Sequence, residues 1–599
     1  MNREQAKVRI LKMLEIVPPM RDILLAPADL EEKRRRLRYL LSDILMKTFE
    51  DDPAIPPLEW IMTRNAGNVF RSILSNRNER LANFSLLAYL EALLHGPDGE
   101  SVPPPSAGFL AELIHLLRSV AGRTDLYTDR VPTFSRYTGR RAARLRSAEL
   151  SRMARDSRTF MDRYASGLSD GVIRRRRANQ ARILRFFGGT DGDWADWRWH
   201  TRHIIRNVQT LEQLVPLTDA EREGVRLARA YRLPFGITPY YLSLFDETAG
   251  GGADRAVRAQ VIPPLNYVRR MKMNRDAADC SMDFMIERDT SPIEGITRRY
   301  PNIVILKPIL TCPQICVYCQ RNWEIEDVYS EHAALGAEKL DRAISWIADT
   351  PEINEVLITG GDPFLLSDER IADLLERVTA IDHVARIRLG TRTPVTLPMR
   401  ITDDLARTVS RFHVPGRREV IVVTHFEHPY EITPEAMEAV QKFRRSGMDV
   451  YNQLVYTFYN SRRFEIALLR HQLRLIGVTP YYTFNTKGKA ETDDYRVPIA
   501  RLLQERHEEA RLMPGTVRTD EIVFNVPRLG KNDLKAAQHH DVIAILPDGR
   551  RVYEFHPWEK KLALVDTYVY TDVSIHEYLR RLRAIGENTA PYRSIWYYY

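Results

Sequence analysis

The sequence predicts an α/β protein whose centre is a partial (β/α)6 barrel of TIM-like shape, preceded by a helical N-terminal extension. Short β-branched runs recur after residue 302, and most are separated by amphipathic helical patterns. Strands and helices that alternate at intervals of roughly 30 residues form right-handed βαβ units with a parallel sheet. The strand runs are 302–310, 356–359, 386–390, 420–424, 450–456 and 480–484, and the clearest helical patterns are 367–380 and 434–446.

Length and composition set the frame for these elements. A chain of 599 residues exceeds what one core usually holds, so we expect several domains. No apolar run reaches the roughly 18 residues of a membrane helix, and charge rather than an apolar signal core follows Met1. Four cysteines are too few for a disulfide framework in a chain of this length. We therefore expect a cytoplasmic protein with no membrane partner.

Residues 1–182 are predicted to form an arginine-rich helical extension. The Pro/Gly/Ser-rich stretch 96–108 splits it into two helical blocks as a linker or long loop. Apolar residues at helical spacing mark the segments 8–14, 37–46 and 83–94, and a second, arginine-rich helical block follows from about 109 to 182. The net charge of +9 and basic runs such as 174–177 suit phosphates, but such runs are more often solvated helix faces. We therefore do not expect nucleic acid as a partner. We expect the extension to serve as an interaction, oligomerisation or capping module.

The remaining chain divides into three predicted parts. Residues 183–300 form a helical region with a tryptophan cluster at 193–200 and a helix at 203–214. Residues 301–535 hold the partial barrel. Residues 536–599 hold a hairpin, with strands at 542–546 and 551–555 around Pro547-Asp-Gly549, and a tail.

Three cysteines lie together directly after the first strand run of the barrel. Cys312, Cys316 and Cys319 follow the pattern C-x3-C-x2-C, whereas Cys280 stands apart. Three thiolates can ligate three irons of a [4Fe-4S] cubane and leave the fourth iron open for chemistry. Zinc would need a fourth Cys or His at a matching spacing. We interpret the stretch as a cluster site, with a zinc site or three buried thiols as the alternatives.

Other candidate residues follow the next strand runs, where the chemistry of such barrels is located. Gly360 and Gly361 permit close approach of the backbone to a ligand, and Asp362 could accept hydrogen bonds from an ammonium group. A capping aspartate at a strand-to-helix turn is the alternative for Asp362. Arg392 and His425 follow the third and fourth strand runs in the same way.

Several long motifs in order make the chain resemble the lysine 2,3-aminomutase family of radical S-adenosylmethionine enzymes, over roughly residues 183–565. Within that family it is most similar to the glutamate 2,3-aminomutase branch. The motifs are Asp196-Trp-Arg-Trp199, Ile237-Thr-Pro-Tyr-Tyr-Leu-Ser-Leu244, Ser291-Pro-Ile-Glu-Gly-Ile-Thr-Arg-Arg-Tyr-Pro301, Gly360-Gly-Asp362, Arg392-Thr-Pro-Val395, Thr424-His-Phe-Glu-His-Pro429 and Asn452-Gln453.

The resemblance implies three cofactors: a [4Fe-4S] cluster, S-adenosyl-L-methionine and pyridoxal 5'-phosphate. Cys312, Cys316 and Cys319 would hold the cluster and serve catalysis. Lys531 matches the family's pyridoxal-bearing lysine, but the glycine-rich run before it is reduced to Gly530. The use of another amine, or of none, therefore remains the alternative. The expected S-adenosylmethionine contacts are Gly360, Gly361, Asp362, Arg392 and His425, and the expected pyridoxal contacts are Arg299, Tyr300, Asn452 and Gln453.

The resemblance also implies the substrate contacts. Arg321 matches the arginine that clamps the substrate α-carboxylate, a role that suits its planar fork. Lys487 and Asn525 stand where the lysine enzyme has two aspartates, although Lys489 could be the residue that points inward instead. A cation and an amide in place of two anions disfavour a lysine side chain and favour an acidic one.

The implied activity is that of an isomerase that converts an L-α-amino acid, glutamate by preference, to its β-isomer. A 5'-deoxyadenosyl radical would remove a hydrogen from C3, and the amino group would migrate from C2 to C3. The implied partners are a small amino acid, a reducing electron donor such as flavodoxin or ferredoxin, and further copies of the chain in a homo-oligomer. The alternatives are an enzyme of this family that acts on lysine, on a protein lysine or on RNA, and a non-enzymatic iron–sulfur nucleic-acid binder.

Overall fold

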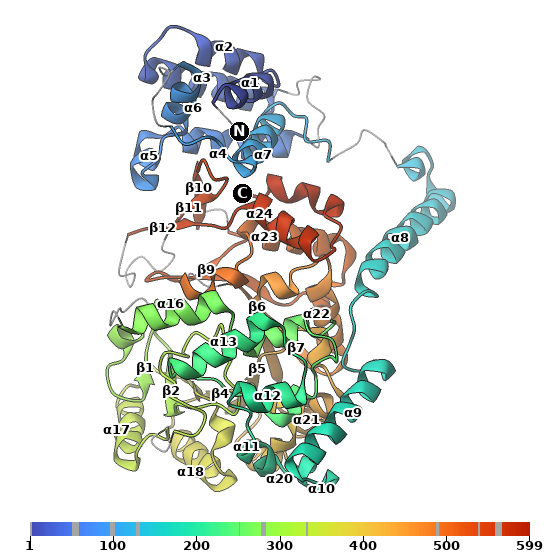
Figure 1. Cartoon of the computed structure of the whole chain (residues 1–599), viewed down its shortest axis with the longest axis vertical. Coiled ribbons are helices and arrows are strands. Elements are labelled where there is room, and N and C mark those ends of the chain that lie inside the picture. Colours follow the sequence, from blue (N-terminus) through green and yellow to red (C-terminus); the bar gives the residue numbers. More distant parts are fainter. Residues whose placement is uncertain are drawn as a thin grey trace. The chain divides into compact units, whose positions relative to one another are not determined.

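The computed structural model describes residues 3–50, 59–95, 102–126, 132–250, 252–276, 283–330, 333–486, 490–536, 539–556 and 566–599 (Figure 1). The chain forms two compact units. One, here called the barrel unit, comprises Ser157–Arg496 and Met513–Val523. The other, the terminal unit, comprises Met1–Asp156, Val497–Leu512 and Phe524–Tyr599. The predicted domain boundary at residue 182 falls inside one helix, α9 (Asp170–Phe187).

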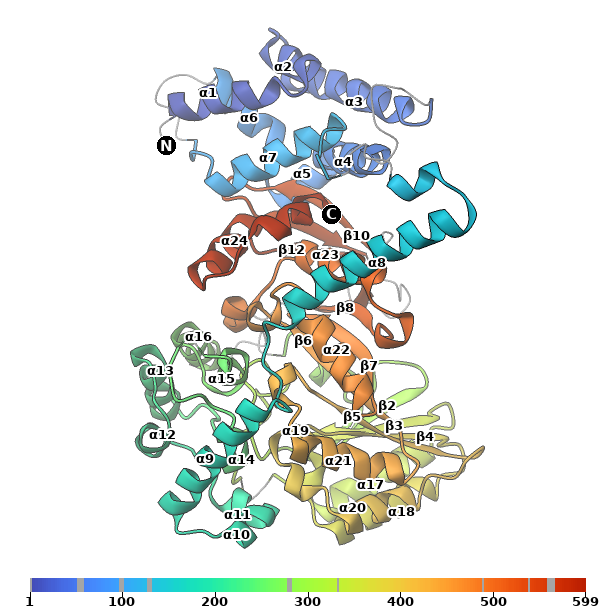
Figure 2. The same cartoon turned by 90° about the vertical axis from the view of Figure 1, so that its right-hand side faces the viewer.

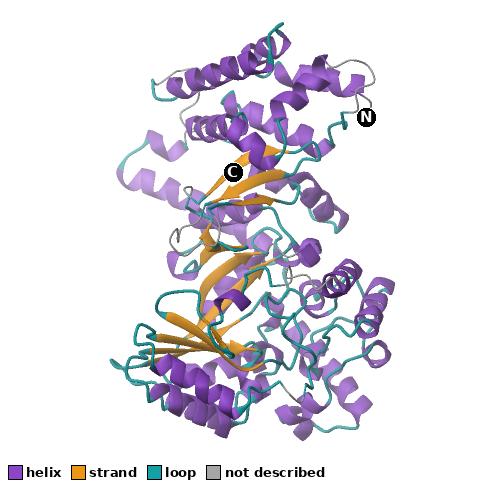
Figure 3. Cartoon of the chain, turned by 90° about the vertical axis from the view of Figure 1, so that its left-hand side faces the viewer, coloured by secondary structure: helices purple, strands orange, loops and turns teal. Residues whose placement is uncertain are grey.

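The sheet of the barrel unit confirms the predicted partial barrel (Figure 3). All six predicted strands form and pair in parallel in sequence order. They are β2 (Ile303–Ile309), β3 (Glu355–Gly360), β4 (Arg386–Gly390), β5 (Glu419–Thr424), β6 (Val450–Tyr456) and β7 (Val478–Asn485). The sequence analysis missed three strands of this sheet, which has nine strands in the described part of the chain and of which the last in order is β9 (Gly530–Asp533). The short β1 (Ile296–Thr297) pairs antiparallel with β2, and β8 (Glu521–Val526) pairs parallel with β7.

Amphipathic helices connect these strands and cover one side of the sheet (Figure 2). Ser367 caps α18 by accepting a hydrogen bond from the backbone N–H of Arg370, and Thr433 caps α21 in the same way through Ala436. Both helices match the predicted patterns to within a residue or two. The connecting helices are α17 (Ala337–Ala348), α18 (Asp368–Thr379), α19 (Thr393–Thr396), α20 (Asp403–Ser410), α21 (Pro434–Arg445) and α22 (Glu465–Leu475).

The two faces of the sheet differ in polarity. Val356 and Ile387 are completely buried on the face that the helices cover. On the opposite face Glu355 forms ion pairs with Arg386 and Arg388 of β4. Successive side chains of a strand point to opposite faces, and Ile303 of β2 pairs with Glu355. Lys307, like Ile305, therefore lies on the same polar face as Glu355. The open side of the partial barrel is therefore charged.

A helical region precedes β1 in the barrel unit. The predicted helix 203–214 is wrong at its start, because His203 ends α11 and the next helix begins only at Val208. The helices are α9 (Asp170–Phe187), α10 (Asp191–Ala195), α11 (Trp197–Arg202), α12 (Val208–Leu214), α13 (Asp219–Ala230), α14 (Pro239–Leu242), α15 (Arg255–Val261) and α16 (Leu265–Asp276).

The terminal unit combines helices from the start of the chain with a small sheet from its end. The predicted hairpin is confirmed as β10 and β11, and a third antiparallel strand, β12, extends it. The predicted helix at 83–94 is wrong at its start, since Asn83 has a left-handed φ of 49° and ends the preceding helix. The strands of the small sheet are β10 (His540–Ile545), β11 (Arg551–Phe555) and β12 (Tyr568–Thr571), whereas β9 (Gly530–Asp533) is the last strand of the nine-stranded sheet.

The helices of this unit are α1 (Arg3–Leu14), α2 (Pro18–Leu25), α3 (Leu30–Lys47), α4 (Glu59–Ile73), α5 (Asn76–Ala82), α6 (Leu86–His95), α7 (Ala107–Val120), α23 (Ile499–Leu512) and α24 (Ile575–Ala584). The long α8 (Gly139–Met161) runs from this unit into the barrel unit. Residues 96–101 of the predicted linker lie outside the described residues. No helix in the described ranges is long and apolar enough to span a membrane.

Candidate active site

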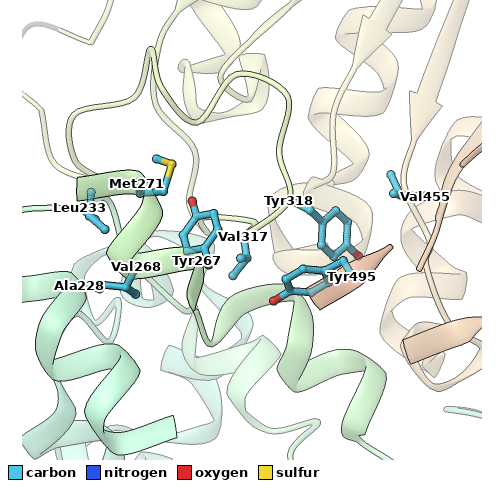
Figure 4. Packing of buried hydrophobic residues seen from close by; sticks show 9 residues of the cluster. All are labelled: Ala228, Leu233, Tyr267, Val268, Met271, Val317, Tyr318, Val455 and Tyr495. Carbon is cyan, nitrogen blue, oxygen red and sulfur yellow. The ribbon is translucent and has the colours of Figure 1, made fainter. Parts of the chain in front are cut away.

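The cysteine loop follows β2 and is held by the helical region that precedes the sheet. The backbone N–H of Ile315 donates to Gly236 O at 3.0 Å, and that of Val317 donates to Gln260 O at 2.8 Å. Val317 lies beside Tyr267 of α16, and Tyr318 lies beside Tyr495 with ring centroids 5.3 Å apart, in one buried apolar cluster (Figure 4). The helical region predicted to be structural therefore fixes the loop that carries the thiols.

The three predicted ligands lie on this loop as partly buried free thiols. Arg392 Nη1 donates to Cys316 Sγ, and the backbone N–H of Arg321 donates to Cys319 Sγ at 3.3 Å. Burial raises the pKa of Cys312 and of Cys316, so metal ligation is the natural way to hold these thiols as thiolates.

Gln314 gives an independent test of whether this loop fits a cluster. Its side chain is only 3% exposed, and neither its amide oxygen nor its amide nitrogen has a hydrogen-bond partner in the described part of the chain. An orphaned buried amide is rare in proteins and calls for a partner. Its place between Cys312 and Cys316 fits a loop that surrounds an inorganic group, and three thiolates with N–H donors to sulfur fit an iron–sulfur cluster.

Arg392 lies at the centre of a buried polar network beside the thiols. Its guanidinium donates to Glu431 Oε1 at 2.8 Å, to His425 O at 3.1 Å and to Gln260 Oε1. Glu431 is fully buried and also accepts from Gln260 Nε2 at 3.0 Å and from the Tyr241 hydroxyl at 2.7 Å. Cys316 and Glu431 outweigh the effect of burial and raise the pKa of Arg392 well above its ordinary value. The loop after β4 is thus tied to the cysteine loop.

The Gly-Gly-Asp motif joins β3 to the cysteine loop. A side chain at Gly361 would overlap the backbone of Thr311, and the N–H of Asp362 donates to Thr311 O at 2.9 Å. The close backbone approach that the two glycines were predicted to permit is therefore made to the cysteine loop. The buried Asp362 carboxylate accepts four hydrogen bonds from the protein, which is about the number that a carboxylate can accept. The donors are the Thr391 hydroxyl and the backbone N–H groups of Phe364, Arg392 and Thr393.

This arrangement gives Asp362 the capping role that the sequence left as the alternative, and burial raises the pKa of its carboxyl group. Its predicted contact with the ammonium of S-adenosylmethionine would have to share acceptors that are already in use. Gly360, with a φ of 117°, closes β3 in a conformation that favours glycine.

The loop after β5 and the strand β6 carry the next candidates. His425 is partly exposed, and its Nδ1 lies 3.9 Å from Glu427 Oε1. Asn452 is buried and exchanges two hydrogen bonds with the backbone of Phe426, at 2.6 and 3.0 Å. Asn452 therefore joins β6 to the loop after β5. Its neighbour Gln453 is partly exposed in β6.

Arg321 and Arg299 form a cationic site beside the cysteine loop. Arg321 makes a two-point ion pair with the buried Glu287, through Nε at 2.9 Å and Nη2 at 2.9 Å. No described residue accepts a hydrogen bond from the Arg299 side chain, and burial, together with Arg321, lowers the pKa of Arg299. Tyr300 is partly buried next to it. An arginine in this state fits an anionic group such as a coenzyme phosphate.

Two predicted residues belong to the terminal unit, and one lies outside the described residues. Lys531 is half-buried on β9, after a turn in which Arg528 and Gly530 have φ values of 64° and 86°. The structure thus places it on a strand directly after the single glycine, Gly530. Asn525 is buried on β8. Lys487, with its neighbour Lys489, falls in the range 487–489 that the structure does not describe.

The sequence analysis missed four residues of this site: Gln260, Glu287, Gln314 and Glu431. Glu431 lies two residues beyond the quoted motif that ends at Pro429, so a longer reading of that motif would have found it. Glu287 and Gln260 carry no local signal, because their partners are distant in the sequence.

Comparisons with known proteins agree with this geometry. The family model of the radical SAM superfamily matches residues 306–465. An uncharacterized KamA family protein of Methanocaldococcus jannaschii is 44% identical over 98% of this chain and 97% of its own length. The L-lysine 2,3-aminomutase of Clostridium subterminale is 35% identical over 52% of this chain and 71% of its own length. The glutamate 2,3-aminomutase of Clostridioides difficile is 33% identical over 53% of this chain and 70% of its own length.

The relatives confirm the resemblance found in the sequence, although two branches with such similar identities do not separate one substrate from the other. Superfamily membership brings a [4Fe-4S] cluster and S-adenosylmethionine, for which the thiol loop provides a fitting site. The chain belongs to the KamA family of the radical SAM superfamily and is an enzyme of the isomerase class.

Proposed function

We propose that this chain is an amino acid 2,3-aminomutase that depends on S-adenosylmethionine and pyridoxal phosphate and converts L-glutamate to its β-isomer. The observation that carries the proposal is the hydrogen bond from the Arg321 backbone to Cys319 Sγ. It joins the carboxylate-binding arginine and a cluster ligand in one turn of chain. A substrate held by its carboxylate at Arg321 would therefore lie beside the source of the radical.

The chain's own residues would contribute position rather than new chemistry. Arg321 would orient the amino acid through its α-carboxylate, and close confinement would keep C3 within reach of the radical and exclude water. Pyridoxal phosphate, when bound, supplies a π-system that stabilises the migrating amino group. Arg299 would meet its phosphate, and Lys531 would attach it.

The choice of glutamate rests on charge. Lys487 and Asn525 stand where the lysine enzyme has two aspartates, and a cation there repels a lysine side chain. An acidic amino acid would gain an ion pair in the same position. Amide amino acids are the next candidates, since they avoid the repulsion without gaining the pair.

Three further proposals follow from the same activity. Reduction of the cluster requires a low-potential donor, for which a reduced flavodoxin or ferredoxin is suited. A cluster with an open iron requires a reducing compartment, as in the cytoplasm. We also propose a homo-oligomer, with the arginine-rich helices of residues 1–182 as the region to test for subunit contacts.

The test is a turnover assay on anaerobically reconstituted protein with S-adenosylmethionine, pyridoxal phosphate and a reductant. Each L-amino acid is offered in turn, and β-isomers are identified by chromatography and mass spectrometry. We expect conversion of glutamate and none of lysine. If lysine reacts and glutamate does not, the substrate proposal is wrong. If S-adenosylmethionine is cleaved but no free amino acid reacts, the aminomutase proposal is wrong.

Lys531→Ala tests the coenzyme assignment separately. We expect wild-type protein to keep pyridoxal phosphate covalently attached after borohydride reduction and this variant to lose that attachment. Lys535→Ala, which changes a nearby exposed lysine, is the control and should retain it. Retention of the attachment in Lys531→Ala would mean that another lysine holds the coenzyme.

A further inference from the structure

The contacts of the Arg321 guanidinium show which of its edges is open to a ligand. A guanidinium has two edges that can hold a carboxylate with two hydrogen bonds, the Nε–Nη2 edge and the Nη1–Nη2 edge. Glu287 occupies the first edge, with Nε and Nη2 each 2.9 Å from its oxygens. No described residue accepts a hydrogen bond from Nη1. The second edge is therefore the one open to a ligand.

Glu287 is itself firmly held. Its side chain is 2% exposed, and Oε1 also accepts from Gln320 Nε2 at 2.9 Å. The Asp283 carboxylate accepts from the backbone N–H of Glu287 at 2.8 Å and from that of Arg288 at 3.0 Å. A residue fixed at both its backbone and its carboxylate can fix the arginine that it binds.

The charges around Glu287 also point to an anionic ligand. Burial raises the pKa of Glu287, but Arg321, with Lys307 and Arg299 nearby, more than reverses this and leaves the pKa below its ordinary value. One glutamate thus serves as the common counter-charge of Arg321 and Arg299. The first keeps an open edge, and the second has no described hydrogen-bond acceptor.

We propose that Glu287 is a positioning residue that holds Arg321 by its side edge and aims its open Nη1–Nη2 edge at the α-carboxylate of the amino acid substrate. This inference rests on the proposed function, in which Arg321 binds that carboxylate. Glu287 itself touches no substrate. It sets the orientation of the fork and keeps Arg321 beside Arg299, so that carboxylate and coenzyme phosphate are bound by one preorganised pair of arginines.

The test measures ligand affinity by calorimetry on holoenzyme reconstituted with cluster, S-adenosylmethionine and pyridoxal phosphate. The probes are L-glutamate and 4-aminobutanoate, which is glutamate without its α-carboxylate. Glu287→Gln keeps the size of the side chain and removes its charge. We expect it to weaken glutamate about 10-fold to 100-fold, to change 4-aminobutanoate less than about threefold, and to raise KM more than it lowers kcat.

Three further variants make the result specific. Glu294→Gln changes a half-exposed glutamate that pairs with Lys339 and should behave as wild type. Glu287→Asp keeps the charge and should recover part of the affinity. In a double-mutant cycle, Glu287→Gln should add little to Arg321→Lys, because both act on one contact. Iron content and uncoupled S-adenosylmethionine cleavage show that each variant is folded and loaded.

The outcomes separate the inference from the function on which it rests. Unchanged glutamate affinity in Glu287→Gln, or equal losses for both probes, would overturn the positioning role while the aminomutase proposal stands. If wild-type enzyme isomerises lysine instead, lysine and 1,5-diaminopentane replace the probes. If wild-type enzyme binds no amino acid, both the proposed function and the role of Glu287 are wrong.

Discussion

Arg392 links a thiol of the cysteine loop to a buried carboxylate. It donates to Cys316 Sγ and to Glu431, which has no exposed surface. Hydrogen bonds to cluster sulfurs and local charge are among the factors that set the reduction potential of an iron–sulfur cluster. We therefore propose that Arg392 tunes the reduction potential of the cluster besides its predicted contact with S-adenosylmethionine.

Arg392→Lys should make the cluster harder to reduce. Lysine keeps the charge but cannot reach the thiol and Glu431 together, so the donor to Cys316 Sγ is lost. Loss of about 1 kcal/mol of preference for the reduced state lowers the potential by about 40 mV. A redox titration followed by electron paramagnetic resonance measures it. Arg400→Lys, at a buried arginine bound to Phe364 O and Leu366 O, is the control. An unchanged potential in Arg392→Lys would rule out the electronic role.

His115 makes the terminal unit sensitive to acid. Its ring stacks on Trp596 with centroids 5.0 Å apart, and its Nδ1 lies 2.9 Å from the Tyr597 hydroxyl. Burial, with Arg118 and Arg551, lowers its pKa from 6.5 to about 4. The unfolded chain therefore binds a proton between these values that the folded unit does not bind.

It follows that stability should be full above pH 6.5 and fall as the pH drops towards 4, by about 2 kcal/mol at pH 5 from this residue. Melting curves at pH 7 and pH 5 measure the difference. His115→Phe keeps the stacking and removes the titration, so its melting temperature should fall less on acidification. An equal fall in His115→Phe and wild type would contradict this assignment.

At the scale of elements, the end of β3 is shaped to meet the cysteine loop. The Gly361 N–H donates to Ile309 O at 2.7 Å, and its missing side chain leaves room for the backbone of Thr311. This contact, rather than a contact with a ligand, explains why glycine is required there. The parallel pairing of β2 and β3 thus continues beyond the strands into the site.

Gly361→Ala should disturb the cysteine loop, since the new methyl group overlaps Thr311 and one of the two segments must move. We expect a loss of about 1–3 kcal/mol of stability, as for other overpacked sites, and incomplete cluster loading. Iron content and the melting temperature report both effects. Gly336→Ala is the matched control, because a methyl group there meets no atom within 4 Å. A Gly361→Ala protein that loads iron normally would show that the contact is not needed.

At the scale of the whole molecule, the two ends of the chain form one unit. Glu112 of α7 and Arg551 of β11 make an ion pair at 2.9 Å, with each side chain 2% exposed. Arg551 also donates to Trp596 O at 2.6 Å. One buried charge pair therefore joins the N-terminal helices, the small sheet and the C-terminal tail.

Arg551→Met should destabilise the terminal unit by about 3–5 kcal/mol, because it leaves the Glu112 carboxylate buried without its partner. We expect faster proteolysis of the N-terminal helices and unchanged iron content, since the thiols belong to the barrel unit. Arg550→Met, at an exposed neighbour paired with Asp548, should have little effect. Equal proteolysis rates in the two variants would show that the buried pair is dispensable.

The strands and the thiol loop were predictable because their signals are local. β6 was predicted at residues 450–456 and forms there, since its β-branched run is bounded by turn residues. β8 (Glu521–Val526) was missed, although α23 (Ile499–Leu512) precedes it as the other helices precede their strands. The helix starts at 83 and 203 were wrong, because a left-handed Asn83 and a cap at His203 interrupt apolar periodicity without changing it.

Spacing along the chain is enough to specify the six parallel strands, the order of their ends and the three thiol ligands, because each depends on residues that are neighbours in the sequence. The partners of the charged groups, in contrast, are not specified by spacing along the chain. Glu287 reaches Arg321 across 34 positions, and Glu431 reaches Arg392 across 39. Such pairs form where loops from different strands converge, and burial selects the partner because an unpaired charge there is costly. The folded chain alone therefore identifies which carboxylate holds each arginine.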